Sequence, residues 1–284
     1  MTSTIGALRR RAVARRPASI GLLLALVFLA LVVIAAVRPE LFAPADPLRV
    51  DLTHTDAAPS FGHPLGTDQL GRGVWTRLVH GTRLSLFIGA AATTVAVVIG
   101  VPLGLLAGLG NRVLDAALSR LFDLFGAFPE ILLALVLIAI VGSGTTNLVV
   151  AIGVAAAPRF ARVMRAETKV VVESEYLTQA RLLIRSRALL VLRHVLPNAI
   201  GTLPVLITLG LGTAILGTAA LSFLGFGPQP PTPEWGAMLA ESRDDLRIAW
   251  WSALFPGVAI TATVIATTAV GHEVRRRFER REGR

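Results

Sequence analysis

The sequence contains no cysteine and little charge. Without cysteine, the chain can form no disulfide, no thiolate nucleophile and no cysteine-ligated metal site. Only 16% of its 284 residues are charged, whereas an average soluble domain carries about 25%. This deficit excludes a conventional soluble enzyme or binding module, and the 54% of hydrophobic residues excludes disorder. The remaining class is an integral membrane protein.

Sequence motifs that would carry chemistry are also lacking. No Gly-x-x-x-x-Gly-Lys-Ser/Thr loop occurs, so the chain cannot bind ATP through a P-loop. No Gly-x-Ser-x-Gly or His-Glu-x-x-His motif occurs, and the 5 histidines are scattered without metal-ligand spacing. We therefore predict a transporter, channel or scaffold that is not an enzyme and holds no cofactor or metal of its own.

Long uncharged apolar runs are abundant, and a helix needs about 20 such residues to cross a bilayer. The first run exceeds the core of about 7–15 residues of a cleaved signal peptide, which favours a retained span. In the second run, Gly100, Gly104 and Gly108 recur at four-residue spacing, which either permits close helix packing or reflects the frequency of glycine in membrane helices. The four clear runs are 19–37, 84–110, 199–221 and 248–271.

Residues 131–158 form a further uncharged run, interrupted by turn-favouring residues at 142–147. As one helix the run would span about 42 Å, too long for one crossing and too short for two of about 30 Å. It is either a re-entrant hairpin or two spans that take charges into the membrane. Both chain ends are rich in arginine and are predicted to be cytoplasmic, which requires an even number of spans. We therefore predict six spans, with the third at 121–141 and the fourth at 147–165.

The net charge of +10 supports this topology rather than a nucleic-acid partner. Six spans place most of the 28 basic residues in the cytoplasm, many of them at 159–193. Arg159 is expected near the cytoplasmic end of span four, where its side chain can reach the interface. Glu130 falls inside span three, where a carboxylate marks a transport pathway or lies in a water-filled cytoplasmic vestibule.

The cytoplasmic loop at 166–198 interleaves apolar and basic residues at helical spacing. This pattern predicts two short amphipathic helices that lie on anionic lipid headgroups or dock into a groove of another protein. The loop resembles the "EAA" loop of permease subunits of ABC importers, specifically the dipeptide, oligopeptide and nickel group. The matching residues are Glu175, Tyr176, Ala180, Arg181, Leu183, Ser186, Arg193, His194, Leu196, Pro197 and Asn198.

The resemblance implies that this loop is the coupling helix that inserts into a cleft of an ATP-binding subunit. Ile184 stands where the family has its most characteristic glycine, whose positive φ is costly for a β-branched residue. Ile184 therefore implies either another turn geometry or a different coupling contact. Three further departures are Thr178-Gln179 within the motif, Thr218 in place of a glutamate, and His272 at a position that is often aspartate.

Two outer segments extend the resemblance, namely 63–72 and 221–236. The second is rich in proline, which stiffens an extended chain without hydrogen-bond partners. It serves either to anchor the protein at the headgroup level or, as the resemblance implies, to dock a substrate-binding protein. The candidate docking residues are Pro231, Pro233 and Trp235.

The resemblance implies an all-α, type I ABC importer permease fold with six transmembrane helices and both termini cytoplasmic. Residues 1–80 would comprise the N-terminal tail, the first span and an outer segment, and residues 81–284 the permease core. The implied partners are a homologous "B-type" permease, two ATPase subunits that hold ATP and Mg, an extracytoplasmic binding protein and membrane lipid, without nucleic acid. The implied location is the bacterial inner membrane.

The implied function is to form half of the pore of an ATP-driven importer for dipeptides or oligopeptides. Glutathione and nickel chelates remain alternative substrates within the same architecture. An ion-coupled secondary transporter is a further alternative, but it needs paired ionisable residues in the membrane and often an internal repeat. Only Glu130 is a plausible intramembrane acid, and no internal repeat is evident. A structural membrane scaffold is the third possibility.

Overall fold

The computed structural model describes residues 20–183 and 186–282, and for 181–183 and 278–282 it describes the backbone only. These ranges are helical and contain no β-sheet. The α-helices are α1 Ile20–Val37, α2 Val74–Leu109, α3 Arg112–Gly126, α4 Glu130–Val141, α5 Thr145–Val172, α6 Glu175–Leu183, α7 Arg187–Leu190, α8 Leu196–Ala199, α9 Leu203–Phe223, α10 Trp235–Glu241 and α11 Trp251–Glu282. Shorter helical turns are η1 Pro39–Leu41, η2 Leu52–His54, η3 Val191–Val195 and η4 Ile200–Thr202.

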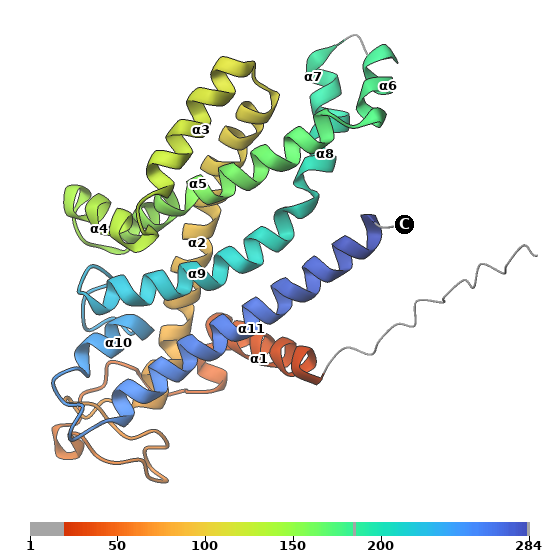
Figure 1. Cartoon of the computed structure of the whole chain (residues 1–284). Helices are drawn as coiled ribbons and strands as arrows, with labels where there is room; N and C mark the ends of the chain where they lie inside the picture. Colours follow the sequence, from red (N-terminus) through yellow and green to blue (C-terminus); the bar gives the residue numbers. More distant parts are fainter. Residues whose placement is uncertain (1–19, 184–185, 283–284) are drawn as a thin grey trace, which may run out of the picture.

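The long helices form a bundle with two distinct ends (Figure 1). One end carries α6 and α7, and we name it the loop end. The opposite end carries the segment 38–73 and α10, and we name it the α10 end. The chain direction alternates between these ends, so that α1 begins and α11 ends on the same side of the bundle.

The helices agree with the predicted number of spans. Five continuous helical stretches are long and apolar enough to cross a membrane, and α3 with α4 would make a sixth if the bent pair is one span. The prediction of one continuous third helix over 121–141 is wrong, because α3 and α4 meet at an angle of 90°. The break falls just before α4, where Pro129 lacks a backbone donor and disfavours helical backbone at the preceding residue.

The second span is longer than its uncharged run. α2 begins at Val74 rather than at residue 84, and its first turns include Arg77 and Arg83. Arg77 is buried, and two carboxylates pair with its guanidinium. Because hydropathy cannot anticipate these partners, the start of the helix was predicted too late.

The glycines of α2 confirm the close-packing interpretation. A Cβ atom added at Gly104 would lie 2.5 Å from the carbonyl oxygen of Ala161 and 2.6 Å from Cβ of Met164. Gly100 and Gly108 meet α5 in the same way, one helical turn to each side. The small residues therefore let α2 approach the backbone of α5 at a distance that any side chain would prevent.

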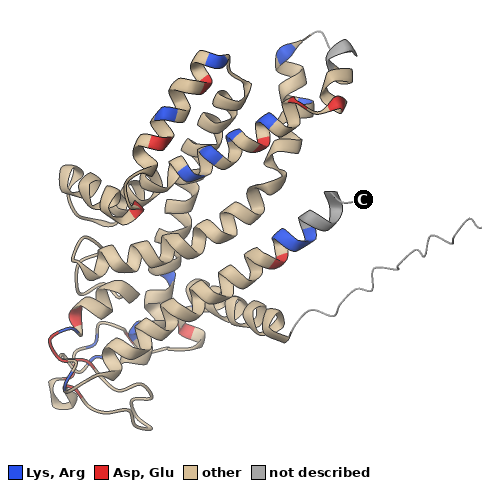
Figure 2. Ribbon diagram, in the orientation of Figure 1, with Lys and Arg blue, Asp and Glu red and all other residues tan. Residues whose placement is uncertain are grey.

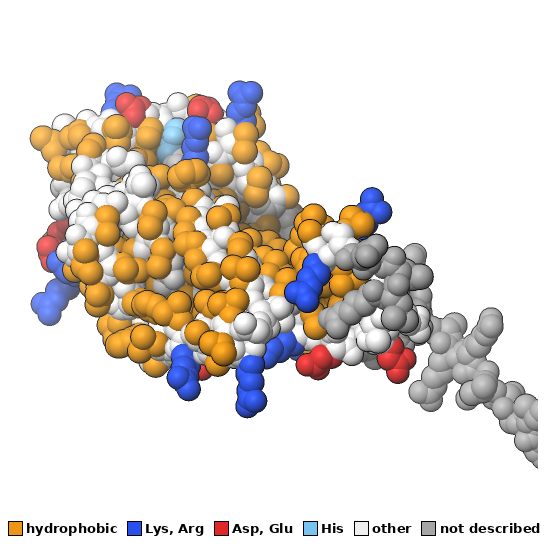
Figure 3. Space-filling model, turned by 90° about the horizontal axis from the view of Figure 1, so that it is seen from above, with side chains coloured by type: hydrophobic (Ala, Val, Ile, Leu, Met, Phe, Trp, Pro, Cys, Tyr) orange, Lys and Arg blue, Asp and Glu red, His pale blue; other side chains and the backbone are white. Residues whose placement is uncertain are grey.

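The surface of the bundle suits a lipid environment. Figure 2 shows most acidic and basic residues near the two ends, while α9 and most of α11 carry none. Figure 3 shows hydrophobic side chains over much of the face seen from above, with charged side chains toward its edges. α1 has a mean hydropathy of 3.2 over a window that is only 11% buried within the chain. Its exposed leucines and valines therefore face lipid or another subunit.

Candidate functional sites

The loop end presents α6 as a short helix with one anchored face. Ser174 precedes it and accepts a hydrogen bond from the backbone N–H of Leu177 at 3.3 Å, which caps the helix. Leu177 and Ala180 are buried beneath the helix, whereas Glu175 and Tyr176 are exposed. The anchored face fixes the position of α6, and the exposed face is free to contact another protein.

The second half of the predicted motif lies against the first. The hydroxyl of Tyr176 lies 2.5 Å from Nδ1 of His194 in η3, and their rings are 5.6 Å apart. Asn198 in α8 donates from its amide to the carbonyl oxygen of His194 at 2.6 Å. Tyr176, His194 and Asn198 therefore form one hydrogen-bonded chain that joins α6 to the start of span five.

The other described residues of the motif lie outside this hydrogen-bonded chain. Ser186 caps α7 by accepting a hydrogen bond from the backbone N–H of Leu189 at 3.4 Å. Arg193 and Pro197 are exposed. The side chains of Arg181 and Leu183, and Ile184 as a whole, lie outside the described residues, so the glycine-to-isoleucine departure remains an open prediction.

A second site lies where α4, α5 and α9 meet. Glu130 at the start of α4 lies 3.7 Å from Arg159 of α5, measured from Oε2 to the guanidinium NH1. Arg159 also donates from its other terminal nitrogen to the hydroxyl of Thr213 on α9 at 2.9 Å. Glu130, Arg159 and Thr213 therefore form a partly exposed polar group on a mostly apolar bundle.

Arg159 lies near the middle of α5 and pairs with Glu130. Its expected place at the cytoplasmic end of span four stays a prediction. The sequence held one usable signal, because Arg159 and Glu130 are opposite charges at the two edges of the same uncharged run. Thr213 offered no such signal, since hydroxyl residues are scattered along α9.

The burial of Trp235 contradicts the prediction that this residue docks a substrate-binding protein. Its side chain is only 2% exposed, and its indole N–H donates to the carbonyl oxygen of Leu78 at 3.0 Å. Glu234, also buried, caps α10 by accepting hydrogen bonds from Gly236 at 3.0 Å and Ala237 at 2.8 Å. Trp235 is thus a core residue in this structure, whereas Pro231 is exposed and Pro233 is half-buried.

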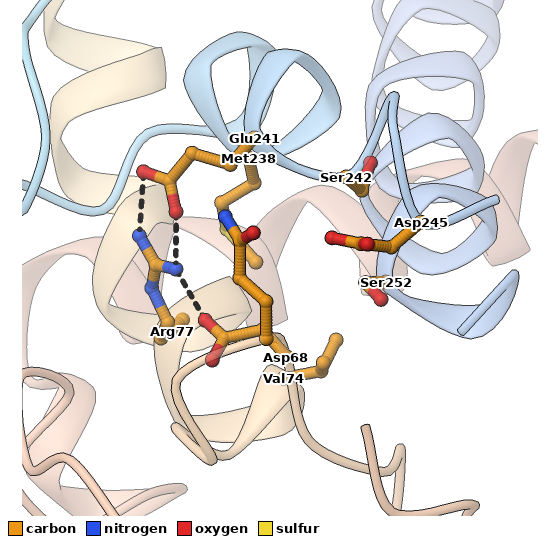
Figure 4. Close-up of a pocket in the computed structure, with 9 residues that line it drawn as sticks. Asp68, Val74, Arg77, Met238, Glu241, Ser242, Asp245 and Ser252 are labelled. Carbon is orange, nitrogen blue, oxygen red and sulfur yellow. Dashed lines mark hydrogen bonds and ion pairs between the residues drawn. The ribbon is translucent and has the colours of Figure 1, made fainter. Parts of the chain in front are cut away.

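Four charged residues at the α10 end form a group that sequence reasoning missed. We name Asp68, Arg72, Arg77 and Glu241 the α10-end ion cluster. Arg77 lies 2.6 Å from Asp68 and 2.7 Å from Glu241. Figure 4 shows its guanidinium between these two carboxylates. Arg72 completes the cluster with contacts of 2.8 Å to Asp68 and 2.6 Å to Glu241. The cluster joins the segment 38–73 and the adjoining helix α2 to α10, which lies more than 100 residues further along the chain.

Comparison with known families decides the identity of the chain. Residues 100–284 match the family described as "Binding-protein-dependent transport system inner membrane component". The chain belongs to this family. It is therefore an inner-membrane permease component, and the matched region includes the loop at 166–198 together with α9, α10 and α11.

Characterised relatives cover most of this permease. It is 42% identical over 217 residues to the dipeptide transport system permease protein DppC of Alkalihalophilus pseudofirmus, covering 76% of this chain and 71% of the relative. It is 42% identical over 225 residues to the glutathione transport system permease protein GsiD of Pectobacterium atrosepticum, covering 79% and 75%. It is 40% identical over 261 residues to the di/tripeptide transport system permease protein DppC of Pseudomonas aeruginosa, covering 90% and 86%.

Solved structures confirm the permease fold. The inward-facing MetNI methionine ABC transporter matches with a TM-score of 0.56 at 19% identity, over 70% of this chain and 96% of that chain. An amino acid ABC transporter crystallised with histidines matches with a TM-score of 0.54 at 18% identity, over 72% and 94%. At this identity the likeness concerns the fold alone. It confirms the all-α architecture of an ABC importer permease.

Proposed function

We propose that this permease forms half of the translocation pore of an ATP-driven importer of short peptides. The observation that carries the proposal is its similarity, at about 40% identity over most of the chain, to permeases named for dipeptides and di/tripeptides. The second half of the pore is a homologous permease subunit. The chain itself has no P-loop, so two separate ATPase subunits hydrolyse ATP.

The loop end is the surface that meets an ATPase subunit. α6 rests on buried Leu177 and Ala180, whereas Glu175 and Tyr176 are exposed. The hydrogen bond between Tyr176 and His194 ties α6 to the segment entering span five. Movement of a docked ATPase subunit would therefore be transmitted to the pore-forming helices through a short, bonded path.

The arginine distribution orients the permease. The basic residues of α3, α5 and α7 gather toward the loop end, and the described basic residues of α11 lie toward its C-terminal end. The positive-inside rule places these regions in the cytoplasm, so both termini are cytoplasmic. The α10 end then faces the extracytoplasmic side, where exposed Pro231 and half-buried Pro233 are available to a substrate-binding protein.

Glutathione is the second candidate substrate. One relative of equal identity is named as a glutathione transport system permease. Glutathione is itself a tripeptide with a free ammonium group, so the two substrates share their chemistry. The substrate-binding protein that delivers the ligand would discriminate between them.

The test is ATP-driven uptake by the assembled transporter. The permease, its homologous partner, the ATPase subunits and the binding protein are reconstituted into proteoliposomes, and uptake of labelled dialanine and of glutathione is measured. We expect Glu175→Ala or Arg181→Ala either to separate ATP hydrolysis from uptake or to prevent the ATPase subunits from co-purifying. Full coupling in both variants would refute the role of the loop, and uptake without any ATPase would favour a secondary transporter.

A further inference from the structure

A cavity of about 190 Å³ lies between α4, α5 and α9, beside the pair Glu130–Arg159. It is smaller than the pockets of about 300–1,000 Å³ that enclose drug-sized ligands, so it has room for one end of a peptide. Its walls are apolar apart from Glu130 and Thr213. The lining residues are Glu130, Ile131, Ala134, Ile152, Thr213, Leu216, Gly217 and Leu221.

The cavity lies at mid-depth in the bundle. Thr213 is at the middle of α9, and Arg159 is near the middle of α5. Ionisable groups at this depth are costly and usually mark the path of a substrate. Transporters of other architectures also bind substrate near the membrane midplane. The position therefore suits a transient binding site along the translocation path.

Glu130 is the charge that the cavity presents. Its side chain is 35% exposed, and no hydrogen bond from the described part of the chain reaches its carboxylate. Arg159 lies 3.7 Å away, a distance at which charges attract without a hydrogen bond. A carboxylate that was only a structural counter-ion would be expected to bond directly to the guanidinium. Here its oxygen atoms remain available to another donor.

Arg159 is held in place by a different residue. Its guanidinium donates to Thr213, whose hydroxyl in turn donates to the carbonyl oxygen of Gly210 at 2.9 Å. Arg159 does not line the cavity, although it lies beside Glu130. It is therefore a positioning residue beside Glu130, whereas the charged group that lines the cavity is the carboxylate of Glu130. A cationic ligand group can pair with the carboxylate of Glu130 in this arrangement.

We propose that Glu130 binds the free α-ammonium group of the transported peptide while the cavity receives the first side chain. This inference rests on the proposed function, since it names the part of the substrate that the pathway recognises. An ammonium group offers three donors to a carboxylate, and hydrogen bonds between charged groups are stronger than those between neutral groups. The apolar walls from Ile131, Ile152 and Leu216 suit a hydrocarbon side chain.

The experiment measures ATP-driven uptake of dialanine by the complete transporter in proteoliposomes. We compare Glu130→Gln, Arg159→Met, the double variant, and Glu40→Gln as a matched control at an exposed position of η1. Loss of a charged hydrogen-bond partner should lower kcat/KM about tenfold in Glu130→Gln. The double variant should stay as low, because removing Arg159 cannot restore the lost negative charge, and Glu40→Gln should match the wild type.

Two results would overturn the proposal. Wild-type uptake by Glu130→Gln would show that the carboxylate does not bind substrate. Recovery in the double variant would show that Glu130 only neutralises Arg159. Absence of dialanine uptake by the wild-type transporter would instead contradict the proposed function, so the two failures are distinguishable.

A second variant decides the matter if Glu130→Gln does not assemble. Leu216 lines the cavity and is 52% exposed, so Leu216→Phe narrows the cavity without overfilling the core. We expect this variant to reduce uptake of Phe-Ala at least about tenfold more than uptake of dialanine, because the first side chain no longer fits. An unchanged ratio between the two peptides would refute binding of the first residue in this cavity.

Discussion

The hydroxyl of Tyr176 lies 2.5 Å from Nδ1 of His194, which joins the exposed helix α6 to the turn that enters span five. The two residues are separated by 18 positions and by the segment at 184–185. Through this contact, a force on α6 would reach η3 and then α8. The amide of Asn198 extends the link by one further hydrogen bond.

Tyr176→Phe removes this hydrogen bond and keeps the ring. A single hydrogen bond contributes about 1 kcal/mol, so we expect roughly a fivefold drop in peptide transported per ATP hydrolysed. The ratio of uptake to ATPase activity in proteoliposomes measures this effect. His194→Asn provides the control, because its amide can still reach the hydroxyl, whereas His194→Leu should reproduce the defect. Equal ratios in the wild type, Tyr176→Phe and His194→Leu would show that the contact does not transmit coupling.

Gly104→Ala should destabilise the contact between α2 and α5. The added Cβ would lie 2.5 Å from a backbone oxygen, and overpacking of this kind costs about 1–3 kcal/mol. Thermal unfolding of the purified permease complex in detergent measures the loss. Gly21→Ala is the matched control, since nothing lies within 4 Å of a Cβ at that position. If both variants melted at the same temperature, the close approach of α2 and α5 would not be needed.

Arg77→Met should destabilise the α10 end strongly. It leaves the carboxylates of Asp68 and Glu241 partly unpaired, and breaking a buried ion pair costs about 3–5 kcal/mol. The expected result is a lower melting temperature and faster proteolysis within 38–73. Arg243→Met is the control, because Arg243 is 62% exposed and its pair with Asp244 measures 3.8 Å. A surface pair of this kind contributes at most about 1 kcal/mol, so the control should melt like the wild type.

Asp56→Asn should stabilise the α10 end at neutral pH. Burial, together with the nearby carboxylates of Asp245 and Asp68, raises the pKa of Asp56 above its usual 3.8. Its ionised form is therefore disfavoured in the folded protein. The free energy of unfolding falls as the pH rises from 3.8, the pKa in the unfolded chain, to the raised pKa in the folded protein. Asparagine removes the charge and tolerates the φ of 51° at this position.

We expect Asp56→Asn to raise the melting temperature at pH 7 by an amount that corresponds to less than about 1 kcal/mol, because the residue is half-exposed. The difference from the wild type should shrink as the pH is lowered and vanish below 3.8, where Asp56 is protonated in both the folded and the unfolded chain. Asp244→Asn, whose side chain is 90% exposed, should show no such pH dependence. A difference that grew on acidification would contradict the sign of this argument.

The low charge and long apolar runs were sufficient to predict a polytopic helical protein, because the cost of burying backbone and charge in lipid acts on each segment locally. The loop residues Glu175, Tyr176, His194 and Asn198 were likewise recognisable, since they lie close together in the chain as a motif. Local sequence also contained the reason for the bend between α3 and α4, namely Pro129. The prediction of one continuous helix rested on hydropathy and did not use this proline.

Only the tertiary structure shows which charged and polar side chains lie in contact. Arg77 and Glu241 are 164 positions apart, and Arg159 and Thr213 are 54 apart, so no local pattern could pair them. The burial of Trp235 likewise depends on Leu78, which a different helix supplies. The sequence by itself determined which segments enter the membrane, because that energy is nearly additive along the chain. The partners of polar groups inside the bundle depend on how helices pack, and packing is a property of the whole fold.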